Sequence, residues 1–118
     1  MKINKELKEL IESKPLSFST VNKALAPHTI YIMYVKIVEE NKILITDNYM
    51  KKTKANILFN KNVSLSLLVG EAGFEFKGKA EYFSTGPLIE QVKRIPENKG
   101  FPCKGAILVS IKEIIKMG

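Results

Sequence analysis

KILITDNYMKKTKANILFNKNVSLSL, residues 42–67, is the stretch that decides the fold. An apolar run typical of a β-strand ends at Thr46, and the polar residues Asp47 and Asn48 then offer side chains that can cap a helix. Good helix formers follow, and the alternation of apolar residues with serines from Val63 onward predicts a second strand. The stretch therefore predicts strand, helix and strand, with a buried helix face of four residues: Met50, Ala55, Leu58 and Phe59.

Most of the remaining chain alternates with the period of two that is typical of strands. Leu16, Phe18 and Thr20 fall on one face of the first strand, and the last strand ends in KEIIKM, which fits a strand or a helical turn. The predicted strands are 16–21, 28–38, 42–46, 63–70, 74–83 and 105–117, and the predicted helices are 3–13, 48–59 and 88–95. Short strands joined by short loops favour a mainly β, antiparallel barrel of about six strands with peripheral helices.

Length and composition restrict the class of protein further. The 118 residues are enough for one domain, and 45% hydrophobic residues exclude a disordered chain. A single cysteine, Cys103, and a single histidine, His28, exclude a disulfide framework and a multi-Cys or multi-His metal site within one chain. No apolar run reaches membrane-spanning length and the N-terminus does not resemble a signal peptide, so we expect a soluble, cytoplasmic protein.

The densest polar cluster lies at residues 46–53, where the strand ends and the helix begins. Free backbone N–H groups and the positive end of a helix dipole meet at such a junction. Thr46 and Thr53 add hydroxyl groups, and Lys51 and Lys52 add positive charge, so the cluster suits a phosphate. An ordinary capped helix with solvated lysines explains the same residues equally well.

The order of motifs around this cluster resembles that of the FMN-binding split barrels related to pyridoxamine-phosphate oxidase. The matching positions are Thr46, Lys52-Thr53, Asn56-Ile57, 60–62 and Val63, together with SFSTVN (17–22), APHTIYIMYV (26–35) and FEFKGKAEYF (74–83) with its Gly-x-Ala motif. The length fits the minimal FMN-binding proteins best, because nothing here corresponds to the C-terminal substrate region of the full oxidase. The turn at 22–26 departs from the family pattern, because it contains no glycine.

The resemblance implies a six-stranded antiparallel split barrel of Greek-key type, forming a homodimer with FMN at the interface. It implies a flavin-dependent oxidoreductase or an electron carrier, and it identifies no catalytic residue. The phosphate would be held by Thr46, Lys52 and Thr53 with the backbone from Asp47 to Met50. The ring system would lie along the second strand. The implied cofactor-binding residues are Thr29, Ile30, Tyr31, Ile32, Thr46, Asp47, Asn48, Met50, Lys51, Lys52 and Thr53.

Other interpretations remain open at this point. The net charge of +7 and five strand aromatics, Tyr31, Tyr34, Phe74, Phe76 and Tyr82, also fit a barrel that binds single-stranded nucleic acid, although core packing is the favoured role for those rings. The same fold with F420 or haem is a third possibility. His28 is interpreted as a strand-start residue and Cys103 as an ordinary loop residue, ahead of flavin contact and thiol reactivity respectively.

Overall fold

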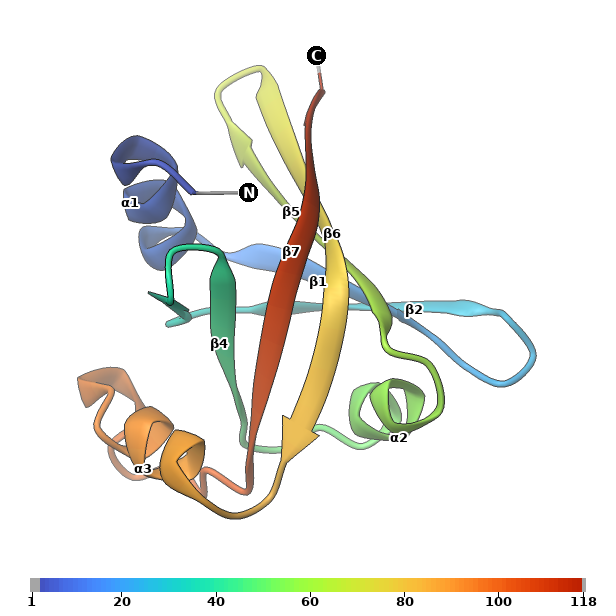
Figure 1. Cartoon of the computed structure of the whole chain (residues 1–118), viewed down its shortest axis with the longest axis vertical. Helices are drawn as coiled ribbons and strands as arrows, with labels where there is room; N and C mark the ends of the chain where they lie inside the picture. The colour runs from blue at the N-terminus through green and yellow to red at the C-terminus, as the bar shows by residue number, and fades with distance from the viewer. Residues whose placement is uncertain (1–2, 118) are drawn as a thin grey trace.

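The computed structural model describes residues 3–117, which form one antiparallel sheet with helices around it (Figure 1). Within these residues the sheet has seven strands in the order β2-β1-β5-β6-β7-β4-β3. The strands are β1 (Leu16–Val21), β2 (Pro27–Ile32), β3 (Lys36–Val38), β4 (Lys42–Asp47), β5 (Asn62–Val69), β6 (Ala72–Phe83) and β7 (Gly105–Met117). The helices are α1 (Lys5–Ser13), α2 (Lys52–Phe59) and α3 (Pro87–Lys93), and a short 3-10 turn, η1, covers Pro96–Asn98. The mainly β, antiparallel architecture is confirmed.

The strand predicted over 28–38 is wrong as a single element. Tyr34 adopts a left-handed backbone conformation with a φ of 61°, which ends β2 and turns the chain before β3. β2 then pairs with β1, whereas β3 pairs with β4 at the opposite end of the strand order. The sheet therefore has seven strands where six were predicted.

The core lies inside the curve of this sheet. Leu16, Phe18 and Thr20 share one face of β1 as predicted, and the structure buries that face, as it buries Phe76 and Ala80 on β6. β1 and β2 cross behind β6 and β7 at a steep angle (Figure 1), so the two ends of the sheet enclose one apolar interior. The alternation read from the sequence thus assigns the inner faces of β1 and β6 correctly.

Gly78 explains why the Gly-x-Ala motif of β6 needs its glycine. β6 has a register irregularity with respect to β7 between Lys77 and Gly78. A Cβ atom at Gly78 would lie 2.4 Å from the backbone oxygen of Ser110. The next inward position, Ala80, is fully buried. The Gly-x-Ala motif is therefore required by the close packing of β6 on β7.

Helix α2 starts later and buries a different face than predicted. Asp47 ends β4, and the helix begins only at Lys52. Leu58, Phe59 and Ala55 are exposed, so the predicted buried face is wrong at these three positions, whereas Met50, which precedes the helix, packs partly against the core. The buried residues are Thr53, Asn56 and Ile57. Asn56 is tolerated in the interior because its amide nitrogen donates a 3.0 Å hydrogen bond to the buried hydroxyl of Thr20 on β1.

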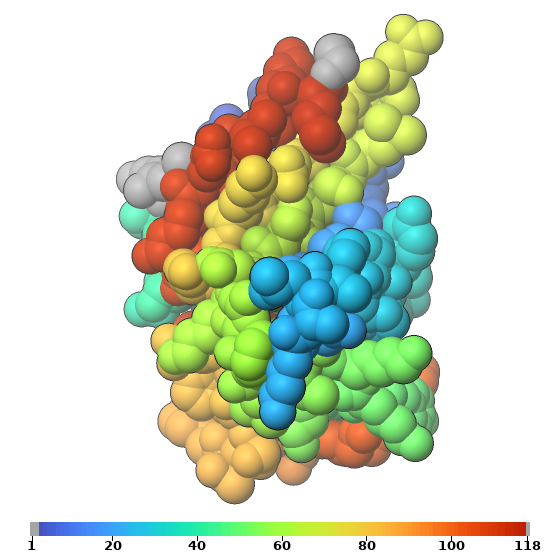
Figure 2. All heavy atoms as spheres, turned by 90° about the vertical axis from the view of Figure 1, so that its right-hand side faces the viewer, coloured from blue at the N-terminus to red at the C-terminus, as the bar shows by residue number. Residues whose placement is uncertain are grey.

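The β1–β2 hairpin turns without a glycine. The Asn22 side-chain oxygen accepts hydrogen bonds from the backbone N–H groups of Ala24 (2.9 Å) and Ala26 (3.0 Å), and Leu25 takes the left-handed position with a φ of 62°. The hairpin tip lies against α2, whose residues are green in Figure 2, and the Lys23 ammonium group is 6.0 Å from the centre of the Phe59 ring. None of the helices within residues 3–117 is long and apolar enough to span a membrane.

Candidate functional site

A cavity of about 500 Å³ lies between β2, the loop that follows β4, and the segment around η1. We call it the junction cavity, because it opens where β4 gives way to α2. Its volume falls within the range of small-ligand sites, which is roughly 300–1,000 Å³. The lining residues are His28, Ile30, Tyr31, Ile32, Met33, Tyr34, Thr46, Asn48, Tyr49, Met50, Lys51, Lys52, Asn98 and Phe101.

The structure brings most of the predicted cofactor-binding residues together in this one cavity. Eight of them line it: Ile30, Tyr31, Ile32, Thr46, Asn48, Met50, Lys51 and Lys52. Thr29 is not among the lining residues, because its hydroxyl bonds that of Ser19 at 2.8 Å on the other face of β2. Asp47 and Thr53 are buried and do not line the cavity. The two predicted segments, one on β2 and one at the β4–α2 junction, therefore meet in space.

The N-terminus of α2 carries the positive charge of the cavity. Lys51 stands at the cap position and its side chain makes no capping hydrogen bond. The first N–H groups of the helix therefore lack a side-chain cap, and the exposed Lys51 and Lys52 lie beside them. Uncapped N–H groups, the helix dipole and two ammonium groups together favour an anionic group here.

A buried carboxylate shapes the loop before this helix. Asp47 is fully buried; one of its oxygens accepts the Met50 N–H at 2.8 Å, and the other accepts the hydroxyl of Tyr82. Burial, the hydrogen bond to Asp47 and the charge of Asp47 raise the pKa of Tyr82 far above its ordinary value, so its hydroxyl remains a donor at neutral pH. Gly105, the register partner of Asp47, leaves room for the Tyr82 ring.

Residues 95–103 form the third wall of the cavity, and the sequence alone gave them no role beyond a loop. Asn98 donates from its amide nitrogen to the Thr46 hydroxyl oxygen at 2.7 Å, and the Cys103 N–H donates to the Asn48 side-chain oxygen at 2.9 Å. The Phe101 ring meets that of Tyr49 edge-on, with centroids 6.3 Å apart. No motif in the sequence signals these contacts, because each joins residues about 50 positions apart.

Aromatic side chains form the rim of the cavity. The expectation that Tyr31 and Tyr34 belong to the core is wrong, because Tyr31 is 78% and Tyr34 43% exposed. Phe76 is fully buried, and Phe74 and Tyr82 pack partly against the core, as expected of them. The exposed Tyr31 and Tyr34 line the junction cavity beside the apolar side chains of Ile30 and Ile32.

The single histidine, His28, and the single cysteine, Cys103, have different surroundings. His28 is half-buried at the start of β2 and lines the junction cavity. Cys103 is buried in a small apolar cluster with Leu44, Val92 and Ile95, so it is a packing residue and not an exposed loop thiol. Across residues 3–117, His, Cys, Asp and Glu side chains form no group of three or more that could hold a metal ion.

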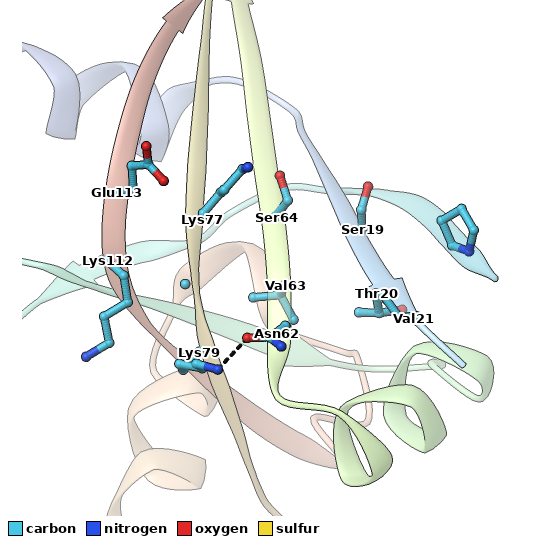
Figure 3. A pocket seen from close by; sticks show the side chains of 12 residues that line it. Ser19, Thr20, Val21, Asn62, Val63, Ser64, Lys77, Lys79, Lys112 and Glu113 are labelled. Carbon is cyan, nitrogen blue, oxygen red and sulfur yellow. Dashed lines mark hydrogen bonds between the residues drawn. The ribbon is translucent and has the colours of Figure 1, made fainter. Parts of the chain in front are cut away.

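A second hollow, the outer-face groove, crosses β1, β5, β6 and β7 on the outside of the sheet and has a volume of about 540 Å³. Figure 3 shows Ser19, Ser64, Lys77 and Glu113 side by side on these four strands, and each is the register partner of the next. This row follows from strand alternation alone. The groove has neither a helix N-terminus nor the motifs around Thr46, so we assign the candidate site to the junction cavity.

Comparison with known proteins identifies the family. The family model for pyridoxamine 5'-phosphate oxidase matches residues 3–118, and the chain belongs to this family. An uncharacterised protein of Methanocaldococcus jannaschii is 27% identical over 122 residues, which cover 99% of this chain and 82% of that protein. The resemblance noted from the motifs at 42–67 is thereby confirmed.

Solved structures confirm the split-barrel fold. HupZ of Group A Streptococcus superposes with a TM-score of 0.88 at 20% identity, over 98% of this chain and 94% of that one. An FMN-binding protein of Syntrophomonas wolfei superposes with a TM-score of 0.76 at 15% identity, over 96% and 82% of the two chains. Other structures of this fold include an F420 reductase and HutZ, the haem storage protein of Vibrio cholerae. The fold thus serves several cofactors.

Proposed function

We propose that this protein is an FMN-binding flavoprotein that works as an oxidoreductase or an electron carrier. The observation that carries the proposal is the meeting of Ile30, Tyr31 and Ile32 on β2 with the phosphate-type cluster at Thr46 and Lys52 in one cavity. Neither segment alone distinguishes a cofactor site from an ordinary strand or an ordinary helix start. Together they offer an apolar wall and an anion site within a volume of about 500 Å³.

The donor set fits the phosphate of FMN. A phosphate monoester presents acceptor oxygens only, and the junction offers the uncapped N–H groups of α2, the Thr46 hydroxyl and the ammonium groups of Lys51 and Lys52. The ring system would then lie along β2, against Ile30 and Ile32. When bound, FMN supplies hydride or electron transfer, while the chain binds and orients it.

The test is a titration of the purified protein with FMN, followed by absorption and by quenching of flavin fluorescence. We expect micromolar or tighter binding and the absorption bands of bound flavin. A protein that arrives colourless and leaves FMN fluorescence unchanged at these concentrations would contradict the proposal.

Lys52→Ala separates the phosphate end of the site from the ring end. We expect about tenfold weaker FMN binding, the equivalent of one charge-assisted contact, and riboflavin binding within about twofold of the parent, because riboflavin lacks the phosphate. Lys93→Ala, on the exposed surface of α3, is the matched control for loss of one positive charge. Equal losses for both ligands would contradict the role of Lys52.

Haem is the second candidate, and one observation favours it. His28 lines the cavity and its imidazole is an ordinary axial ligand for haem iron. Titration with haemin and with F420 beside FMN ranks the three ligands directly. A Soret band that shifts in His28→Ala, with no binding of FMN, would favour haem over the flavin.

We further propose that the protein is a homodimer whose second copy covers the outer face of β1 and β5. Side chains there are small and paired across strands, as in Ser17 with Ser66 and Ser19 with Thr29. A further hollow on this face is flanked by the exposed Leu68 and by Tyr31, which also lines the junction cavity. A partner on this face would therefore reach the cavity through Tyr31.

A further inference from the structure

Residues 95–103 are anchored at both ends, and they contact the loop that follows β4. Ile95 and Cys103, at its two ends, are buried against Leu44 and Val92, and the backbone between them is held by the hydrogen bonds of η1. Asn98 itself is buried. The segment therefore holds its polar groups at fixed positions beside β4 and the loop that follows it.

The hydrogen bonds of the Asn98 side chain determine in which direction the Thr46 hydroxyl can donate. The Asn98 amide nitrogen donates to the carbonyl oxygen of Val92 at 2.8 Å, and a carbonyl can only accept, so this atom is a nitrogen. Its second hydrogen goes to the Thr46 oxygen at 2.7 Å. Thr46 therefore accepts from Asn98, and its own single proton is left for an acceptor elsewhere, at the wall of the junction cavity.

The same reasoning applies to Asn48. The Cys103 backbone N–H can only donate, so the Asn48 atom that it meets at 2.9 Å is the side-chain oxygen. The Asn48 amide nitrogen, with two hydrogens, is then left for acceptors. Asn48 lines the junction cavity together with Thr46. Both side chains are thus oriented as donors by partners from one distant segment.

We propose that Asn98 and the Cys103 backbone are positioning groups that orient Thr46 and Asn48 as a wall of hydrogen-bond donors, and that this donor wall selects flavins ending in a phosphate monoester over flavins ending in a hydroxyl. A phosphate monoester offers only acceptors when fully ionised, so every group on the wall can bond to it. A terminal hydroxyl has a proton of its own and a weaker acceptor. The inference rests on the proposed function and adds to it the residues that set selectivity.

Asn98→Asp tests the proposal at nearly constant shape. The carboxylate can accept the Thr46 proton, which reverses the polarity of the hydroxyl, and it also loses the bond to the Val92 carbonyl oxygen. We expect the ratio of the riboflavin to the FMN dissociation constant to fall by about tenfold. Asn4→Asp, at the exposed N-cap of α1 and outside the junction cavity, makes the same change in charge and keeps the oxygen that accepts the Leu7 N–H, so it should leave the ratio within about twofold.

Thr46→Val tests whether Asn98 acts through the Thr46 hydroxyl or only stabilises the fold. If Asn98 acts through the Thr46 hydroxyl, Asn98→Asp should change the FMN-to-riboflavin selectivity little further once that hydroxyl is gone. Strictly additive losses in the double variant would overturn the proposal. An unchanged ratio in a folded Asn98→Asp protein would also overturn it, while FMN binding by the parent would leave the proposed function standing.

If Asn98→Asp does not fold, Asn48→Asp provides a second test. The remaining side-chain oxygen at position 48 can still accept the Cys103 N–H, while a second oxygen, an acceptor, replaces the amide nitrogen. We expect a loss of selectivity of similar size, about tenfold, in the same fluorescence titrations. Unchanged selectivity in this variant would overturn the role of the donor wall. A parent protein that binds no FMN at all would overturn the proposed function and this inference with it.

Discussion

The junction cavity and the outer-face groove have similar volumes, about 500 and 540 Å³, but they are built in different ways. The groove takes its polar side chains from exposed strand positions such as Lys77 and Glu113, which repeat with the alternation of the sheet. The cavity takes its polar groups from a strand–helix junction, where the buried Asp47 and Asn98 hold them in place. Fixed and convergent polar groups, and not volume, therefore mark the candidate site.

The largest expected difference between the two regions is in their contribution to folding stability. Asp47→Ala removes the acceptor of the Met50 N–H and of the Tyr82 hydroxyl, leaving both donors without their partner. We expect a loss of about 2–4 kcal/mol in the free energy of unfolding. Urea denaturation, followed by circular dichroism, measures it directly.

Glu113→Ala in the outer-face groove is the matched carboxylate control. The Glu113 side chain is exposed, so we expect its removal to change the free energy of unfolding by no more than about 0.5 kcal/mol. Similar losses for Asp47→Ala and Glu113→Ala would mean that the polar groups of the cavity are no more firmly held than those of the groove.

Two glycines, Gly105 beside Tyr82 and Asp47 at the junction and Gly73 outside both regions, give a smaller but sharper contrast. A Cβ atom at Gly105 would lie 2.1 Å from the Tyr82 hydroxyl oxygen, so Gly105→Ala must displace the ring that bonds Asp47. We expect a loss of about 1–3 kcal/mol in the free energy of unfolding, as for other overpacked sites. The displaced Tyr82 should also weaken FMN binding, since Asp47 would lose one of its two partners.

Gly73→Ala is the control on β6, beside the hollow at Leu68. Its Cβ atom would lie 3.3 Å from the flexible end of Met117, and the Leu67 backbone oxygen and the Met117 Cβ, both at 3.7 Å, are at ordinary contact distance. We expect a change in the free energy of unfolding below about 0.5 kcal/mol. If thermal or urea denaturation shows that Gly105→Ala is as mild as Gly73→Ala, the Tyr82 ring does not need the space above Gly105.

The sequence predicts the regular parts of the fold well, because they depend on local alternation. The inward faces of β1 and β6 follow from a period of two, and the β4–α2 junction follows from polar residues after an apolar run. The same local reasoning cannot see the break at Tyr34, because nothing in a run of β-branched and aromatic residues indicates a left-handed backbone there. The count of six strands instead of seven has this origin.

The parts that the sequence could not predict depend on contacts between distant residues. Asn56 is buried while Leu58 is exposed, because Thr20, 36 residues away, supplies a hydrogen-bond partner. Asn98 and Cys103 reach Thr46 and Asn48 across 52 and 55 residues of chain. A local pattern carries no signal for such pairs, so the third wall of the cavity emerges only from the structure.

The smallest expected change in the free energy of unfolding belongs to the substitution that tests dimer formation. Leu68 and Leu58 are 68% and 66% exposed, yet only Leu68 lies on the outer face of the sheet that we propose to be covered by a second copy. Leu68→Glu should shift the protein from dimer to monomer in light scattering coupled to size-exclusion chromatography. It should change the free energy of unfolding of the single chain by no more than about 0.5 kcal/mol, because an exposed leucine contributes little to its own fold.

Leu58→Glu, on the exposed surface of α2, introduces the same charge and should leave the mass unchanged. Burying a new carboxylate between two chains is costly, which is why one substitution on the correct face suffices to separate them. If both variants remain dimeric, the partner docks elsewhere than on the outer face of β1 and β5. If Leu68→Glu is monomeric and also binds FMN more weakly, the second copy contributes to the site, and the outer face and the junction cavity act as one functional surface.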